Sequence, residues 1–209
     1  MQKLTSPIVI RLIQAVLGLE IVSGLLTQTW PAVFAGAATL ILTFLPERFA
    51  GLFGIRLPRS VLTAIVVFIF ATLFLGEVGD FYERFWWWDV VLHFSSALSF
   101  GAIGFLLIFM LFEGDRYAAP PWALSVLAFC VGLSIGALWE VFEFSMDQLF
   151  GMNMQKSGLV DTMKDLIIDS IGAAIGAFSG YLYLKGRQLG GLGQMLEQFV
   201  DANKRWYGK

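Results

Sequence analysis

The stretch WEVFEFSMDQLFGMNMQKSGLVDTMKDLIID, from Trp139 to Asp169, decides how the rest of the chain is interpreted. It belongs to two segments that are otherwise apolar enough to span a bilayer. Even so, it carries carboxylates at helical spacings, namely Glu140, Glu143, Asp147, Asp161, Asp165 and Asp169. Ionisable groups at membrane depth are costly, so they indicate a functional site and call for a partner. The partner that the sequence offers is its only histidine, His93, one helical turn after Asp89.

The composition predicts a membrane protein. Of the 209 residues, 57% are hydrophobic and 14% are charged, whereas soluble domains carry about 25% charged residues. The formal net charge of -2 leaves no basic stripe for phosphates, which argues against a nucleic-acid partner. We therefore expect the surface to contact membrane lipids, and the sequence leaves open a homo-oligomer.

Apolar segments long enough to cross the hydrocarbon core, roughly 20 residues each, number about six. The predicted fold class is an all-α polytopic membrane protein, with one compact bundle as a single domain over 1–209. The spans are expected at 7–26, 31–45, 61–78, 89–112, 121–150 and 160–184, with a tail at 185–209. A short segment from Phe49 to Ile55 is expected to lie on the membrane. The tail predicts a C-terminal amphipathic helix at the interface or, equally, a solvated helix with a small docking face.

The distribution of basic residues predicts the orientation. One set of loops holds only Arg84 and Lys156, and the loop with Lys156 is expected to face the outside. The other set and the two ends of the chain hold most of the remaining basic residues, including Lys3, Arg48, Arg56, Arg59, Arg116, Lys185, Arg187, Lys204 and Arg205. Both termini are therefore expected in the cytoplasm.

Glycines at four-residue intervals predict that the last two spans are neighbours. These are Gly132 and Gly136 in the fifth span, and Gly172, Gly176 and Gly180 in the sixth. Small residues at this spacing let helix backbones approach closely, although glycines are also simply tolerated in membrane helices.

Helical geometry places the ionisable groups of each span on one face of its helix. At about 100° per residue, Asp89 and His93 fall about 40° apart, and the acids of each later span fall within about 60–80°. Because the spans alternate in direction, His93, Glu143 and Asp165 come to one level, about one turn below the outer interface, with Glu140 and Asp169 deeper. The sequence thus predicts one site shared by three spans.

Carboxyl groups crowded in a low dielectric either stay protonated or bind a cation. Carboxylate oxygens and one imidazole suit a divalent metal ion: Zn, Mn, Fe, Mg or Ca. The expected ligands are His93, Glu143 and Asp165, joined by Asp89 and Asp161, with Glu140 or Asp169 as the general base. The alternatives are protonated acids hydrogen-bonded to Ser, Thr and backbone, and N-capping by Asp89 and Asp161.

Three segments together resemble the YjdF-like bacterial inner-membrane proteins, and more distantly the VanZ-like proteins. They are WDVVLHF (Trp88 to Phe94), WEVFEFSMDQLFG (Trp139 to Gly151) and MQKSGLVDTMKDLIIDSIGA (Met154 to Ala173). The resemblance implies a multi-pass protein of the bacterial inner membrane, and it adds Gln155 and Thr162 to the signature positions. With Asp147 they are expected to support the site. The VanZ-like link implies envelope chemistry without naming a reaction.

Three functions compete on this evidence. The first is a metal-dependent hydrolase or transferase acting on a lipid or envelope precursor near the outer leaflet. The second is a proton- or cation-coupled transporter that uses the same acids. The third is a non-catalytic scaffold or partner-binding subunit, in which the acids form an interhelical hydrogen-bond network. Whether the protein is an enzyme is left open by the sequence.

Overall fold

The computed structural model describes residues 5–112, 115, 119–187 and 190–208, with side chains from residue 8 onward. Every regular element in these ranges is a helix. Helices long and apolar enough to cross a membrane occur at Ile8–Thr27, Trp30–Leu52, Arg59–Val78, Trp88–Leu111, Pro121–Phe150 and Leu159–Leu184. They confirm the predicted class and the six spans. Lys3 and Arg116, on which the orientation partly depends, lie outside the described residues, and the orientation stays a prediction.

The chain divides into two units, Met1–Trp88 and Asp89–Lys209. The first contains α1 (Thr5–Thr27), α2 (Trp30–Leu42), α3 (Leu45–Leu52), α4 (Arg59–Ile69), the π-helix η1 (Phe70–Val78) and α5 (Phe81–Arg84). Its small core contains Ile13, Leu17, Val66 and Phe74. The segment from Phe49 to Ile55, which was predicted to lie on the membrane, is helical as far as Leu52, where α3 ends. Its helical part belongs to the candidate span Trp30–Leu52. A single domain over 1–209 stays a prediction.

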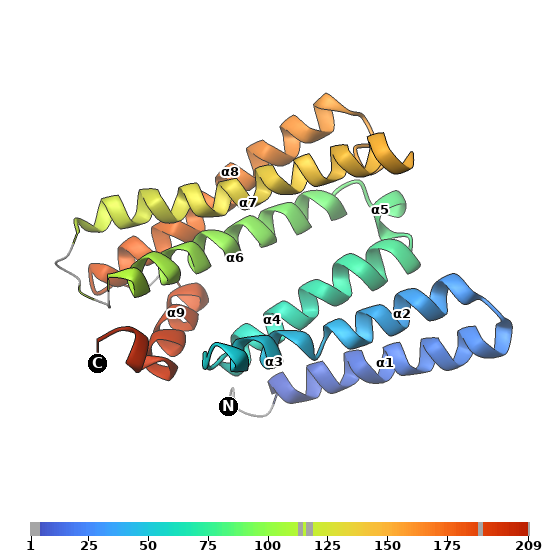
Figure 1. Ribbon diagram of the computed structural model, residues 1–209, viewed down its shortest axis with the longest axis horizontal. Coiled ribbons are helices and arrows are strands. Elements are labelled where there is room, and N and C mark those ends of the chain that lie inside the picture. The colour runs from blue at the N-terminus through green and yellow to red at the C-terminus, as the bar shows by residue number, and fades with distance from the viewer. Residues whose placement is uncertain (1–4, 113–114, 116–118, 188–189, 209) are drawn as a thin grey trace. The chain divides into compact units, whose positions relative to one another are not determined.

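The second unit consists of α6, α7 and α8, followed by a short helical tail. Here α6 spans Trp88–Leu111 and starts one residue before the unit, α7 spans Pro121–Phe150, and α8 spans Leu159–Leu184. Figure 1 shows α7 and α8 side by side along most of their length, with α6 beside them. Pro121 at the first turn of α7 and the left-handed Gly151 (φ 65°) after its last turn explain where that helix begins and ends.

Small residues bring these three helices together, whereas the glycine spacing predicted only that α7 and α8 are neighbours. A Cβ added to Gly101 of α6 would meet the backbone of Ala173 in α8, and one added to Gly132 of α7 would meet the backbone of Gly101. A Cβ on Gly172 would lie 2.7 Å from the carbonyl oxygen of Phe94. Backbones this close exclude larger side chains and hold α6, α7 and α8 at fixed positions relative to one another.

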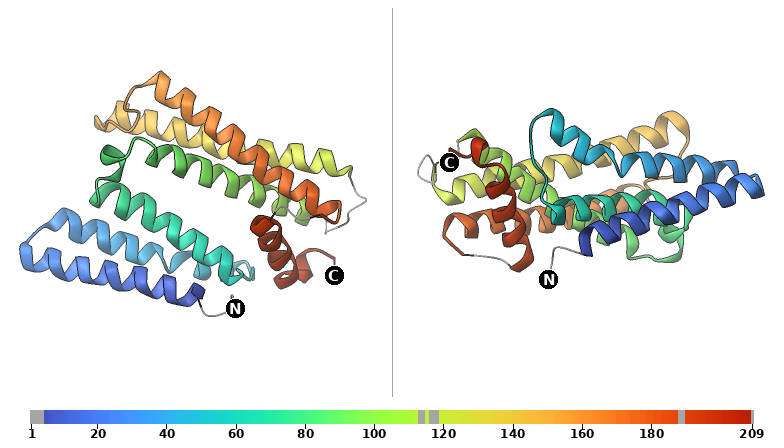
Figure 2. Two further views of the ribbon diagram at one scale, coloured as in Figure 1. Left: turned by 180° about the vertical axis from the view of Figure 1, so that it is seen from behind. Right: turned by 90° about the horizontal axis from the view of Figure 1, so that it is seen from below.

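One end of the second unit is filled by apolar side chains, and we call it the apolar end. Its buried core is formed by Ala102, Phe105, Leu106, Phe109, Leu124, Ala128, Ala177, Leu184, Leu196, Val200 and Tyr207. The last three come from the tail, where α9 (Gly190–Ala202) and the 3₁₀-helix η2 (Lys204–Trp206) lie against the ends of the longer helices (Figure 2). Buried residues of α9 therefore dock on the protein, and a position of this helix at the membrane interface stays a prediction.

Tyr207 secures this docked tail. Its side chain is 2% exposed, and its hydroxyl donates a hydrogen bond to the carbonyl oxygen of Leu106 at 3.2 Å. Burial, reinforced by the nearby Tyr183, raises the pKa of the Tyr207 phenol above its usual value. The hydroxyl therefore keeps its proton, and with it the hydrogen bond to α6, well into the alkaline range.

Candidate metal centre

The opposite end of the second unit holds the acids, and we call it the acid-bearing end. Each of the three long helices contributes buried groups: His93 from α6, Glu140 and Glu143 from α7, and Asp165 and Asp169 from α8. Their exposed fractions run from 0% for Asp169 to 9% for Glu143. These are the residues that helical geometry placed on facing stripes, and the structure brings them into one cluster.

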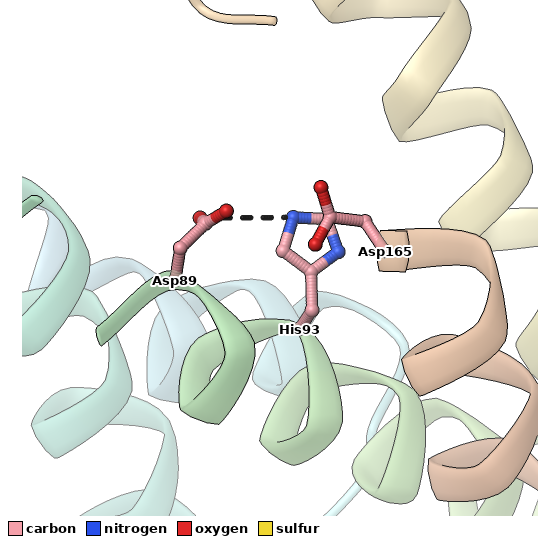
Figure 3. Close-up of side chains that lie close together, drawn as sticks. All are labelled: Asp89, His93 and Asp165. Carbon is pink, nitrogen blue, oxygen red and sulfur yellow. Dashed lines mark ion pairs between the residues drawn. The ribbon is translucent and has the colours of Figure 1, made fainter. Parts of the chain in front are cut away.

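Two of these residues, His93 and Asp165, form with Asp89 a group that could hold a metal ion. One ligand atom each from Asp89, His93 and Asp165 lies within 4.8 Å of the other two. Figure 3 shows Asp89 and His93 rising from α6, and Asp165 reaching toward the imidazole from α8. Two ligands about 2.1 Å from one ion lie at most about 4.2 Å apart. At tetrahedral angles the separation is about 3.4 Å, so binding an ion would draw these atoms together by up to about 1.4 Å.

The two imidazole nitrogens of His93 face different partners. Nδ1 lies 3.3 Å from Asp169 Oδ1, and in the tautomer that carries its hydrogen on Nδ1 it donates to this carboxylate. Nε2 faces Asp89 Oδ1 at 3.9 Å and Glu140 Oε1 at 4.0 Å. A carboxylate on one nitrogen fixes the tautomer and leaves the other nitrogen free to bind a metal, as in many carboxylate–histidine–metal sites.

Gly136 of α7 makes room for Asp169. A Cβ added at Gly136 would overlap Asp169 Oδ2 and lie 2.8 Å from its Cγ. Because the fully buried carboxylate occupies this space, a larger residue at position 136 would displace it from His93. The sequence identified Gly136 as a packing residue and missed this second effect, which depends on a contact between two helices.

Glu140 is the least satisfied group in the cluster. Its side chain is 4% exposed. Neither carboxyl oxygen makes a hydrogen bond to any described residue, although Oε1 lies 4.0 Å from His93 Nε2. A buried polar group without a partner costs about 1–3 kcal/mol, and more when it is charged. Such a group requires an explanation, and a bound ion is one of the few available.

Glu143 and Asp161, both expected as metal ligands, lie outside the group of three. Glu143 accepts a hydrogen bond from Trp139 Nε1 at 2.9 Å, a contact that sequence reasoning missed although the residues are one turn apart. Asp161 lies in the first turn of α8, where a carboxylate favours the helix dipole. Gly158 is the N-cap of that helix, so the suggestion that Asp161 is the cap is wrong.

The supporting residues belong to the connection between α7 and α8. Asp147 accepts hydrogen bonds from the backbone N–H groups of Met154 (2.7 Å) and Gln155 (2.9 Å). The amide of Gln155 in turn donates to the hydroxyl of Thr162 at 2.6 Å. These contacts fasten the connection beside the acid-bearing end.

Comparisons with known proteins agree with the membrane class and name no activity. The chain matches the family model described as predicted membrane protein (DUF2238) over residues 8–186. An uncharacterised protein of Thermotoga maritima is 32% identical over 104 residues, which are 50% of this chain and 53% of that protein. The match therefore spans about half the length of this relative.

No solved structure matches the chain. The YjdF-like resemblance agrees with the matched family, whereas the VanZ-like resemblance receives no support. The family model includes all three helices of the acid-bearing end, and it covers far more than half of the sequence. The chain therefore belongs to the family of predicted membrane proteins DUF2238.

Proposed function

We propose that the acid-bearing end binds one divalent metal ion and that the protein is a metal-dependent hydrolase or transferase acting on a lipid or envelope precursor. The observation that carries the proposal is the group Asp89, His93 and Asp165, with the unpartnered carboxyl of Glu140 4.0 Å from the imidazole. Either feature alone has simpler explanations. Together they describe a buried group of carboxyl side chains around one imidazole.

The ligand set favours zinc, manganese or iron. Imidazole is a borderline ligand that these metals accept beside hard carboxylates, whereas magnesium and calcium prefer oxygen alone. Three protein ligands also leave at least one coordination position for water or substrate, which is the arrangement of catalytic zinc sites. The side chain of Asp89 is 36% exposed, so this position can be reached from the Asp89 side.

Asp169 and Glu140 receive different roles in this proposal. Asp169 already accepts the Nδ1 hydrogen of His93, so we assign it to orienting the imidazole and not to the general base. Glu140 has free oxygens near Nε2, and we assign it the base. An ion held by Asp89, His93 and Asp165 would supply Lewis acidity at this position. Glu140 would take the proton of a water that attacks a carbonyl or phosphoryl centre and would return it to the leaving group, which departs with its bonding electrons.

The apolar end supports a one-sided site over a transport path. The core packed from Phe105 to Tyr207 closes the second unit beyond the cluster, and among its members Tyr207 alone bears an ionisable group. A proton or cation path would need polar or ionisable groups continuing through this region. A substrate with apolar chains also suits a cluster surrounded by lipid-facing residues such as Trp139 and Phe142.

Metal analysis tests the first half of the proposal. Protein purified in detergent, stripped with chelator and dialysed against Zn²⁺ or Mn²⁺ should hold one ion per chain by mass spectrometry. His93→Gln and Asp165→Asn should hold none, while Asp201→Asn, at an exposed position of α9, should match the wild type. A wild type without bound metal in either dialysis would refute the site.

A lipid assay tests the second half. Metal-loaded protein is incubated with vesicles of bacterial total lipids, and the lipids are compared by mass spectrometry. The expected result is a hydrolysed or transferred product that is lost in Glu140→Gln, a variant that keeps all three ligands. Equal product from wild type and Glu140→Gln would refute the role of Glu140, and no product at all would refute a lipid substrate of this class.

A further inference from the structure

We propose that a divalent metal ion reaches the acid-bearing end by way of Asp161, which binds the ion first and passes it to Asp165, one helical turn further along α8. This role rests on the proposed function, because it describes how an ion arrives at that site. It gives Asp161 an effect on the rates of metal uptake and release, and no place among the ligands of the bound ion.

The proposed site is buried, so an approaching ion must lose its water before it can bind. His93 and Asp165 are buried, and the carboxyl of Glu140 has no hydrogen-bond partner among the described residues although it lies 4.0 Å from the imidazole. Removing a charged ion from water is costly unless protein groups of opposite charge replace the lost water. A carboxylate closer to the surface would therefore lower the barrier to uptake.

The acids of α8 form a series that runs from the surface to the imidazole. Asp161 is half-buried in the first turn, Asp165 is buried, and Asp169 is fully buried beside His93. They follow one another at intervals of four residues, so they lie along one face of the helix, with about 6 Å of rise at each step. Because Asp165 belongs to the group that could hold the ion, Asp161 lies one turn from that group, toward the surface.

The corresponding acid of α7 is less suited to this role. Asp147 also lies one turn from a buried acid, Glu143, near the end of its helix. Its two carboxylate oxygens accept hydrogen bonds from the backbone N–H groups of Met154 at 2.7 Å and Gln155 at 2.9 Å. An ion bound there would have to compete with both donors. The series on α8 is therefore the better route.

A carboxylate on the route affects metal exchange differently from a ligand. It stabilises the partly dehydrated ion between the surface and the site, so it lowers the same barrier for uptake and for release. Its removal should slow association and dissociation by the same factor and leave the affinity nearly unchanged. Removal of a ligand instead weakens the bound state and speeds release.

Stopped-flow binding of Co²⁺ in detergent tests this role. Uptake by the wild type and by Asp161→Asn is followed by the visible absorption of the bound ion, and release is followed after the loaded protein is mixed with excess chelator. We expect both rate constants to fall by about 10-fold in Asp161→Asn, with a dissociation constant that changes by less than about 3-fold.

Two matched variants serve as controls. Asp161→Glu keeps a carboxylate at the same position and should exchange Co²⁺ like the wild type. Asp201→Asn removes one negative charge from an exposed position of α9, whose buried residues belong to the apolar end, and should have no effect. If Asp161→Asn does not fold, Asp161→Ser takes its place, because serine also suits the start of a helix.

Thermal unfolding of each variant separates the route from helix stability. A carboxylate in the first turn of α8 also favours the helix dipole, so Asp161→Asn is expected to lose a little stability. A loosened α8 would release the ion faster. Slower release is therefore an effect that a merely structural role of Asp161 would not produce.

The possible failures differ from one another. Unchanged rates in Asp161→Asn would mean that the ion approaches directly, for example at the partly exposed Asp89, and would overturn the role of Asp161 while leaving the metal site intact. Faster release with a large loss of affinity would make Asp161 a ligand and would also overturn it. A wild type that binds neither Co²⁺, Zn²⁺ nor Mn²⁺ would overturn the proposed function together with this route.

Discussion

The two ends of the second unit are built from the same three helices but bury different kinds of side chain. At the apolar end, aromatic and aliphatic side chains form a buried core, with Phe105 and Phe109 stacked at 5.6 Å between centroids. At the acid-bearing end the space is filled by groups that prefer water or a cation, and Glu140 has no hydrogen-bond partner among the described residues. The difference fits a stabilising role for the apolar end and the metal binding that we propose for the acid-bearing end.

The largest expected effect comes from the apolar end. Phe105→Ala removes a fully buried ring that packs on Phe109 and Tyr183, and such truncations cost about 3–5 kcal/mol. Reversible unfolding in mixed detergent should show this loss. Phe105 lies twelve residues from His93 along α6, about 18 Å, so metal affinity should not change. A parallel loss of metal affinity would mean that the two ends are not independent.

An intermediate effect is expected from Asp169, whose carboxylate lies beside Nδ1 of His93. Asp169→Asn removes the negative charge beside His93 Nδ1 while keeping the shape of the side chain. Metal affinity should fall by about 10- to 100-fold. Gly136→Ala should act in the same direction, because its Cβ would displace the carboxylate of Asp169. Competition with a chelator measures both variants, and unchanged affinity in both would remove Asp169 from the site.

The smallest effect is expected at the docked tail. Tyr207→Phe removes the hydrogen bond to Leu106 and should lower the unfolding free energy by about 1 kcal/mol at pH 8. The folded state raises the pKa of this phenol, so it favours the protonated form. The stabilisation is therefore fully present below the unfolded pKa of about 10 and declines as the pH rises above it.

Thermal unfolding at pH 8 and at about pH 10.5 measures this trend. The wild type should lose part of its advantage over Tyr207→Phe at the higher pH. An advantage that grows with pH would contradict the sign of the shift. Metal affinity should be the same in both proteins, because Tyr207 belongs to the apolar end.

Much of the fold could be predicted because a membrane restricts what a sequence can do. Each apolar segment must form a helix that satisfies its own backbone, so segment length was enough to predict six spans. The glycine intervals predicted the contact between α7 and α8, since a four-residue repeat presents one smooth face. Helical spacing also predicted that His93, Glu140, Glu143, Asp165 and Asp169 would meet.

Which carboxyl groups of the cluster come close to His93 could not be predicted in the same way. Spacing places Glu143 and Asp165 at one level, but rotation about the helix axes and side-chain rotamers decide which atoms approach His93. The result is that Asp89 joins Asp165 in the group of three, while Glu143 accepts from Trp139. The anchoring of residues 154 and 155 by Asp147 depends on the path of an irregular loop, which has no periodic pattern.

The sequence by itself determined the membrane-protein class, the six spans and the clustering of acids around one histidine. Hydrophobic length and helical period are local properties, so they can be read from the sequence. Only the tertiary structure decided which nitrogen of His93 is held by Asp169, which is left facing Asp89 and Glu140, and which carboxyl remains without a partner. Those outcomes depend on contacts of a few ångströms between separate helices, and the close backbone approach at Gly101, Gly132 and Gly172 sets them.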